Sequence, residues 1–122
     1  MARAQKLEDL EVWQKAHVLV LQVYETTRSF PDRERFELVA QMRSSAVSIT
    51  ANIAEGFARM HRREKVRFYN ISQGSVSELR YYFILCRDLK YLPSPDGLLA
   101  QIESVSMMLN RLVSVIAEAI DR

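Results

Sequence analysis

The most regular apolar pattern in this chain lies in residues 95–121, which read PDGLLAQIESVSMMLNRLVSVIAEAID. Side chains spaced three and four residues apart share one face of an α-helix, because the helix has about 3.6 residues per turn. Pro95 suits a first helical position, and Ser94 before it is a good N-cap. The pattern therefore predicts a helix over residues 95–121. Its core stripe follows a strict seven-residue repeat: Leu98, Ile102, Val105, Leu109, Leu112 and Ile116.

The same spacing predicts three earlier helices, over residues 10–28, 33–58 and 63–91. Asp9 is a suitable N-cap for the first, and Pro31 and Pro93 disfavour helix beyond the first and third. The expected core stripes are, in chain order, Leu10, Trp13, His17, Val20, Tyr24 and Thr27; Val39, Met42, Ala46, Ile49, Ile53 and Phe57; and Phe68, Ile71, Ser75, Leu79, Tyr82, Cys86 and Leu89.

Long helices with short connections define the expected fold. The 122 residues include only 3 Gly and 3 Pro, so turns are few, and no segment shows the alternation of a strand. This length suits one domain, residues 1–122, and short links favour antiparallel neighbours. The sequence predicts an all-α, up-down-up-down four-helix bundle.

Two apolar runs exceed what one bundle core can bury. Residues 18–24 and 81–85 are apolar almost without interruption, and five consecutive residues cover about 400–500° of a helix. The second predicted helix is also rich in small residues, which let other helices approach closely. Scattered surface apolar residues are one interpretation. The other, which we favour, is a homo-oligomer whose copies bury this surplus.

Composition narrows the class of protein. No apolar run reaches the roughly 18 to 20 residues that span a bilayer, and acids follow the basic N-terminal residues at once, unlike a secretory signal. A lone Cys86 forms no internal disulfide and is expected as a small core hydrophobe. These features predict a cytoplasmic protein with no membrane partner.

The sequence contains no recognisable enzyme site. Glu8 with Glu11, and Glu34 with Glu37, resemble paired metal ligands, but each pair precedes or opens a helix, and antiparallel helices would hold the pairs roughly 25 Å apart. Acids that stabilise helix N-termini explain them. No Glu-x-x-His motif, zinc spacing or phosphate-binding glycine loop occurs. We expect no catalytic residue, metal, cofactor or small-molecule substrate.

A polar stripe borders the core of the second predicted helix: Gln41, Ser45, Ser48, Asn52, Glu55 and Arg59. One interpretation is a solvated flank in which Glu55 and Arg59 form an i,i+4 pair. The other is a hydrogen-bonded network of Asn52 and Glu55 with Arg43 and Glu78, which would fix helix register or subunit contacts.

The most basic segment is residues 59–67, here called the basic turn. It carries five cations and one acid, a charge of +4, while the whole chain carries +2. The bundle topology places it at the same end as Arg3, Lys6 and Lys15. It is either a solvated helix–helix turn or a footprint for phosphates, which an oligomer would multiply. The candidate nucleic-acid-binding residues are Arg59, Arg62, Arg63, Lys65 and Arg67.

Several motifs resemble those of the four-helix bundle proteins encoded within 23S rRNA intervening sequences of bacteria. The resemblance spans about residues 8–92, and its most specific part is Asn-Ile-Ala-Glu-Gly at 52–56, after Gln41 and Arg43. The other matching pieces are Asp9-Leu10-x-Val12-Trp13-Gln14-Lys15-Ala16, Phe30-Pro31-x-x-Glu34, Phe68-Tyr69 and Gly74-Ser75-x-x-Glu78-Leu79.

The resemblance implies a small bundle that assembles as a ring, commonly a pentamer. It also implies kinship to the accessory variability protein of diversity-generating retroelements, a basic barrel that partners a reverse transcriptase and nucleic acid. The chain departs from the family at Thr50, where members often carry Pro, and at Ser44-Ser45, where members often carry two basic residues. The departure at Ser44-Ser45 removes positive charge from the helix predicted over residues 33–58.

The expected function is that of a non-enzymatic homo-oligomer whose basic turns bind structured RNA or DNA backbone without reading sequence. The alternative is an adaptor that docks a protein partner, such as a reverse transcriptase or a ribosome-associated protein. A nucleotide hydrolase would need a metal site that the sequence does not supply.

Overall fold

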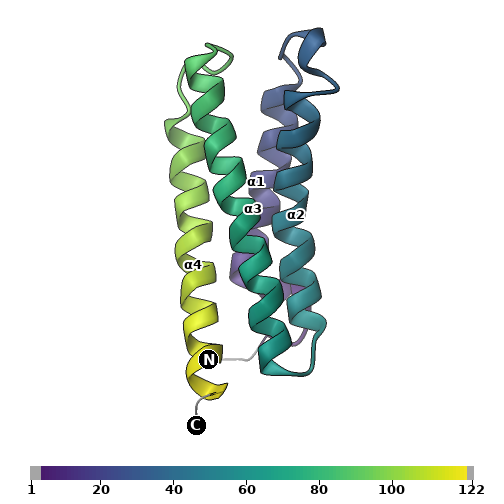
Figure 1. Cartoon of the computed structure of the whole chain (residues 1–122), viewed down its shortest axis with the longest axis vertical. Coiled ribbons are helices and arrows are strands. Elements are labelled where there is room, and N and C mark those ends of the chain that lie inside the picture. The colour runs from purple at the N-terminus through teal and green to yellow at the C-terminus, as the bar shows by residue number, and fades with distance from the viewer. Residues whose placement is uncertain (1–3, 121–122) are drawn as a thin grey trace.

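The computed structural model describes residues 4–120, in which four α-helices and two short 3₁₀ turns account for all regular structure. The helices run alternately up and down (Figure 1). No helix in this part of the chain has the length and apolar composition that crossing a membrane requires. The elements are η1 (Leu7–Asp9), α1 (Glu11–Thr27), η2 (Asp32–Glu34), α2 (Leu38–Ala58), α3 (Arg62–Asp88) and α4 (Asp96–Ile120).

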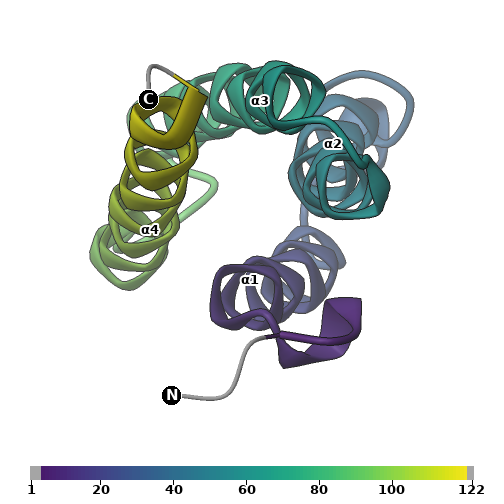
Figure 2. The same ribbon diagram turned by 90° about the horizontal axis from the view of Figure 1, so that it is seen from below.

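The four helices surround one core. Seen along the bundle in Figure 2, they follow one another around it in chain order, with α4 beside α3 and facing α1. The lower end, as drawn in Figure 1, holds the start of α1, the turn between α2 and α3, and the end of α4. The side chains less than 2% exposed and largest in volume include Leu19, Met42, Ile49, Ile53, Leu79, Phe83, Ile102 and Leu109.

The core stripes predicted for α2 and α4 are confirmed over most of their length. On α4, Ile102, Val105 and Leu109 are buried. On α2, five of the six predicted residues are buried, and Phe57 is half-buried. Each helix has a single apolar stripe, so the pattern left one choice of buried face.

The stripe predicted for α1 is displaced by about one residue, although its members Val20 and Thr27 are buried. Val12, Ala16, Leu19 and Val23 face the core, whereas the predicted His17 and Tyr24 are exposed. This helix carries two apolar stripes, and the core takes the aliphatic one. The stripe that we predicted carries aromatic rings and polar atoms, which suit a rim where one end of the side chain meets water. Trp13 and His17 stack there, with ring centroids 5.1 Å apart.

The stripe predicted for α3 is also displaced, although Leu79 and Cys86 belong to both versions and are buried. The observed core residues include Tyr69, Ser72, Val76 and Phe83, while the predicted Ile71 and Leu89 are exposed. Close packing against α2 decides this rotation, because Tyr69 needs the space above a glycine on that helix.

That glycine is Gly56, and it lets α2 and α3 approach closely. A Cβ atom at Gly56 would lie 2.6 Å from Cε1 of Tyr69, too close for any real contact. Further along the same contact, Ser72 Oγ donates a hydrogen bond of 2.8 Å to the carbonyl oxygen of Ile49. Small residues at this crossing therefore bring the two helix backbones together.

The link between α1 and α2 is longer than expected. We predicted the second helix from residue 33, but α2 begins at Leu38, after η2. Tyr91 OH, in the link between α3 and α4, donates a 2.8 Å hydrogen bond to Glu34. The Tyr91 ring also packs on Phe30, with centroids 5.3 Å apart. These tertiary contacts hold η2 out of line with α2.

Two other helix ends differ from expectation. Asp9 does not cap α1; its carboxylate accepts weak hydrogen bonds from the backbone N–H groups of Gln5 and Lys6, which stabilise η1 instead. The third helix ends at Asp88 because Lys90 adopts a left-handed φ of 64°, and the N–H of Tyr91 then donates to the carbonyl of Cys86 at 2.9 Å.

Candidate nucleic-acid interface

The basic turn lies at the lower end of the bundle, between α2 and α3. It shares that end with Lys6 and Lys15, which are exposed near the start of α1. Arg3 was expected there as well, but it falls outside the described residues. The structure thus places the basic turn, Lys6 and Lys15 at the same end of the bundle. The local contacts of the basic-turn residues differ from one another.

Two of the arginines stack on one aromatic ring. The guanidinium carbon of Arg59 lies 4.6 Å from the centroid of Phe68, and that of Arg67 lies 5.1 Å from it. Each arginine also pairs with an acid on its own helix, Arg59 with Glu55 at 2.8 Å and Arg67 with Glu64 at 3.7 Å. All four charged side chains are about half exposed, so water screens these pairs and each contributes little to stability.

Phe68 was expected in the core, and its role as a platform for arginines was missed. A π face attracts a guanidinium and leaves the N–H groups at its edge able to donate to other partners. The only sequence signal was the position of Phe68 directly after Arg67, at the end of the basic segment.

Lys65 has a structural role in the same region. Its ammonium donates hydrogen bonds to the carbonyl oxygens of Gly56 at 3.2 Å and Phe57 at 2.8 Å, in the last turn of α2. Helix C-termini present carbonyl groups without partners, and a cation there also favours the helix dipole. Partial burial lowers the pKa of Lys65 from its usual value. This cation therefore points at its own protein.

Arg62 and Arg63 are the most available cations of the basic turn. Both side chains are exposed, and the ion pairs found within residues 4–120 involve neither of them. His61, directly before them, is exposed as well. The outward-facing positive charge of this turn thus comes mainly from this pair and from the edges of Arg59 and Arg67.

Two serines of the polar stripe of α2 hydrogen-bond to α3. Ser45 Oγ donates to the carboxylate of Glu78, and the hydroxyls of Ser48 and Ser75 lie 2.7 Å apart. Asn52 bonds within α2, because its amide nitrogen donates to the carbonyl of Ser48 at 2.8 Å. The two serine bonds tie α2 to α3 in one register.

The structure does not bring all four proposed network residues together. Glu78 accepts from Ser45, and Asn52 bonds separately to Ser48. Glu55 pairs with Arg59 one turn further on. Arg43 lies on the opposite flank of α2, beside α1.

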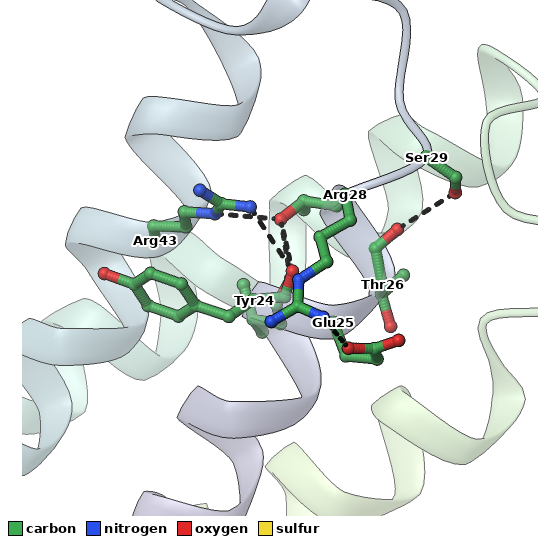
Figure 3. A network of polar contacts seen from close by, with 8 residues as sticks. Tyr24, Glu25, Thr26, Arg28, Ser29 and Arg43 are labelled. Atoms are coloured by element: carbon green, nitrogen blue, oxygen red, sulfur yellow. Dashed lines mark hydrogen bonds and ion pairs between the residues drawn. The ribbon is translucent and has the colours of Figure 1, made fainter.

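Arg43 closes the end of α1, as Figure 3 shows. Its Nε donates to Thr27 Oγ1 at 3.0 Å and its Nη2 to the carbonyl oxygen of Tyr24 at 3.3 Å. The guanidinium carbon also lies 4.6 Å from the centroid of the Tyr24 ring. Arg43 on α2 and Lys65 on α3 therefore perform the same task, since each stabilises the last turn of the preceding helix.

The carboxylates considered as metal ligands lie at opposite ends of the bundle. Glu8 and Glu11 are at the start of α1, and Glu34 is in η2, beyond the other end of that helix. The 17 residues of α1 span about 26 Å. Within residues 4–120, no three or more His, Cys, Asp and Glu side chains are grouped so that they could hold a metal ion.

Comparison with known proteins adds a family and a fold. A model described as 23S rRNA-intervening sequence protein matches residues 8–111. The curated proteins contain no match. The structure is similar to a crystal structure of a protein with unknown function from the S23 ribosomal protein family of Bacteroides thetaiotaomicron, with a TM-score of 0.78 and 18% sequence identity. The alignment covers 84% of this chain and 95% of that one, and at this identity it shows a shared fold.

Proposed function

This chain belongs to the 23S rRNA-intervening sequence protein family, and we propose that its bundle serves as a non-enzymatic, homo-oligomeric module that binds the backbone of structured RNA or DNA. The observation that carries this proposal is the gathering of Arg59, Arg62, Arg63 and Arg67 at one end of the bundle. We expect the module to read charge and shape, because contacts from arginine to phosphate carry no sequence information directly.

Self-association is supported by the outer faces of α1 and α2. On α1, Val18 and Leu21 are 50% and 56% exposed. On α2, the outward side chains are small, and Ala40, Ala51 and Ala58 are exposed. Small side chains let another helix approach closely, and exposed apolar side chains lose contact with water when a second copy covers them.

Assembly would multiply a weak phosphate site. One basic turn offers two unpaired arginines and two stacked ones, which is modest for nucleic acid. A closed ring, with five subunits as the family resemblance implies, would present the same set at each subunit. Affinity then rises through simultaneous contacts without any new contact type.

The assembly can be tested with two single variants. Each places one glutamate on the exposed face of a different helix, and the second variant is the control. We expect the wild-type protein to sediment as a discrete oligomer and Ala51→Glu on α2 to lower its mass. Ala100→Glu on α4 places the same charge on another exposed helical alanine and should leave the mass unchanged. Analytical ultracentrifugation measures all three, and a monomeric wild type would contradict the assembly.

Nucleic-acid binding can be tested with a mixed-sequence RNA duplex about 20 base pairs long, a length that spans a typical double-stranded RNA site. Affinity should fall steeply between about 50 and about 200 mM salt, because bound phosphates release counterions. Arg62→Gln with Arg63→Gln should weaken binding and flatten the salt dependence. Lys65 is left unchanged, because its loss would disturb the end of α2.

The matched control is Arg28→Gln with Arg35→Gln, which removes two exposed arginines from the opposite end of the bundle. This control should bind the duplex like wild type. The absence of binding by wild-type protein at low salt would refute the nucleic-acid proposal, and so would equal losses in the two double variants.

A further inference from the structure

The neighbouring helices α1 and α4 differ in length. α4 has 25 residues and α1 has 17, so α4 is longer by about 12 Å. Thr26 and Gly97 line the same depression near the upper end, so the two helices are aligned there. The excess length therefore projects at the lower end, where α4 reaches lowest in Figure 1.

The apolar stripe of α4 continues along this projecting part. Ile102, Val105 and Leu109 are buried, but the next members of the stripe, Leu112 and Ile116, are only half-buried. Val115 beside them is 62% exposed. The last turns of α4 thus present an apolar surface that extends beyond the start of α1 at the lower end.

This surface forms one wall of a hollow of about 1130 Å³ at the lower end, here called the end hollow. Its apolar lining includes Leu10 before α1, Phe57 at the end of α2, and Val115 on α4. Two turns of helix form a cylinder about 10 Å wide and 12 Å long, which encloses about 940 Å³. The end hollow is thus large enough for two turns of a helix seated where α1 would continue.

Basic residues form another wall of the end hollow. Arg62, Arg63 and Lys65 line it beside His61, and no carboxylate is among its described lining residues. An occupant must therefore supply apolar side chains toward α4 and negative charge toward the turn between α2 and α3. A nucleic-acid backbone supplies only the second of these and would leave the apolar wall in water.

We propose that the end hollow is a docking site for a short, acidic, amphipathic helix of a partner protein. Such a helix would cover Val115 and its neighbours with one face and place its carboxylates against Arg62 and Arg63 with the other. This is helix-in-groove recognition, with anchors spaced three and four residues apart. The inference goes beyond the proposed function and does not depend on nucleic-acid binding.

The test uses a defined probe and the full-length protein. The probe is a fluorescent synthetic peptide of about four helical turns, with leucines spaced three and four apart and glutamates between them. One control peptide replaces every glutamate with lysine, and a second keeps the composition but breaks the leucine spacing. Fluorescence anisotropy should show the probe binding at least about tenfold more tightly than either control, a difference of about 1.4 kcal/mol.

Two substitutions on α4 locate the site. Val115→Gln should weaken probe binding at least about tenfold. Met107→Gln is the matched control, because Met107 is 60% exposed on the same helix and does not line the end hollow. Its affinity for the probe should equal that of wild type. Both positions are exposed, so both variants should fold.

Four outcomes would overturn the inference. Equal binding of all three peptides, or unchanged binding by Val115→Gln, would show that the end hollow does not receive the acidic helix. A change in solution mass on Val115→Gln would assign it to a second copy of this chain. Equal loss of probe and RNA duplex binding on Val115→Gln would assign it to nucleic acid, whereas loss of probe binding alone supports the peptide site.

Discussion

At the scale of single residues, Gly56 allows α2 and α3 to pack closely. Its missing side chain leaves room for the Tyr69 ring, and burial of that ring raises the pKa of Tyr69 to about 12. The sequence marked Gly56 only as part of a family motif and as one of several small residues. Which of these small residues faced Tyr69 depended on how α3 is rotated.

The expected effect of Gly56→Ala is a loss of about 1 to 3 kcal/mol in the free energy of unfolding, because overpacking shifts the ring or the helices. Gly74→Ala is the matched control, since a Cβ atom at Gly74 meets nothing within 4 Å. In the interior of α3 that change should stabilise the protein by about 0.5 to 1 kcal/mol. Urea unfolding followed by circular dichroism measures both, and a stabilised Gly56→Ala would contradict the packing described.

At the scale of elements, two helices end against a cation from the next helix. Arg43 holds the last turn of α1, and Lys65 holds the last turn of α2. Lys65 was predicted as a nucleic-acid-binding residue from its charge, and Arg43 as a member of a network with Asn52, Glu55 and Glu78. Spacing along one helix cannot show that a side chain reaches backward to the helix before it, because that contact depends on how the two helices pack.

Arg43→Gln should loosen the end of α1 and lower the free energy of unfolding by about 1 kcal/mol, because two hydrogen bonds from a charged group are lost. Hydrogen exchange measured by mass spectrometry should speed up in peptides that cover residues 24–30. Arg28→Gln is the control, since Arg28 forms only an exposed pair with Glu25 and should change exchange little. Unchanged exchange in Arg43→Gln would argue against this cap.

At the scale of the whole molecule, two protonated groups in the core link stability to pH. Burial raises the pKa of the Cys86 thiol from 9.0 to about 11, with a smaller contribution from Glu34. Burial likewise raises the pKa of Tyr69 from 10.0 to about 12. Each group releases its proton at lower pH in the unfolded chain than in the folded one. Their contribution to stability is therefore complete below the unfolded values and is lost as pH rises through the folded values.

The urea midpoint should accordingly fall between about pH 8 and about pH 10.5, the range in which the unfolded chain ionises first. Lys65 acts in the opposite direction, because its folded pKa is lowered. Cys86→Ala should reduce the slope of stability against pH, whatever it does to stability at neutral pH. A midpoint that is flat or rises over this range would contradict the assignment.

The sequence alone determined the number of helices, their approximate extents and the end of the bundle at which the basic turn lies. These follow from apolar spacing and from the scarcity of chain breakers, both of which act locally along the chain. Part of the candidate site could be located from the sequence: Arg62 and Arg63 are exposed, and Ser45 and Ser48 of the polar stripe bond to α3, whereas Asn52 bonds within α2.

Tertiary structure decided the rest. It chose the buried face of α1 and α3, because each carries two apolar stripes and only packing against neighbours selects between them. It turned Lys65 and Arg43 toward helix ends and placed Phe68 beneath two arginines. It also made the end of α4 one wall of the end hollow, because α4 is longer than its neighbour α1 and extends beyond it at the lower end.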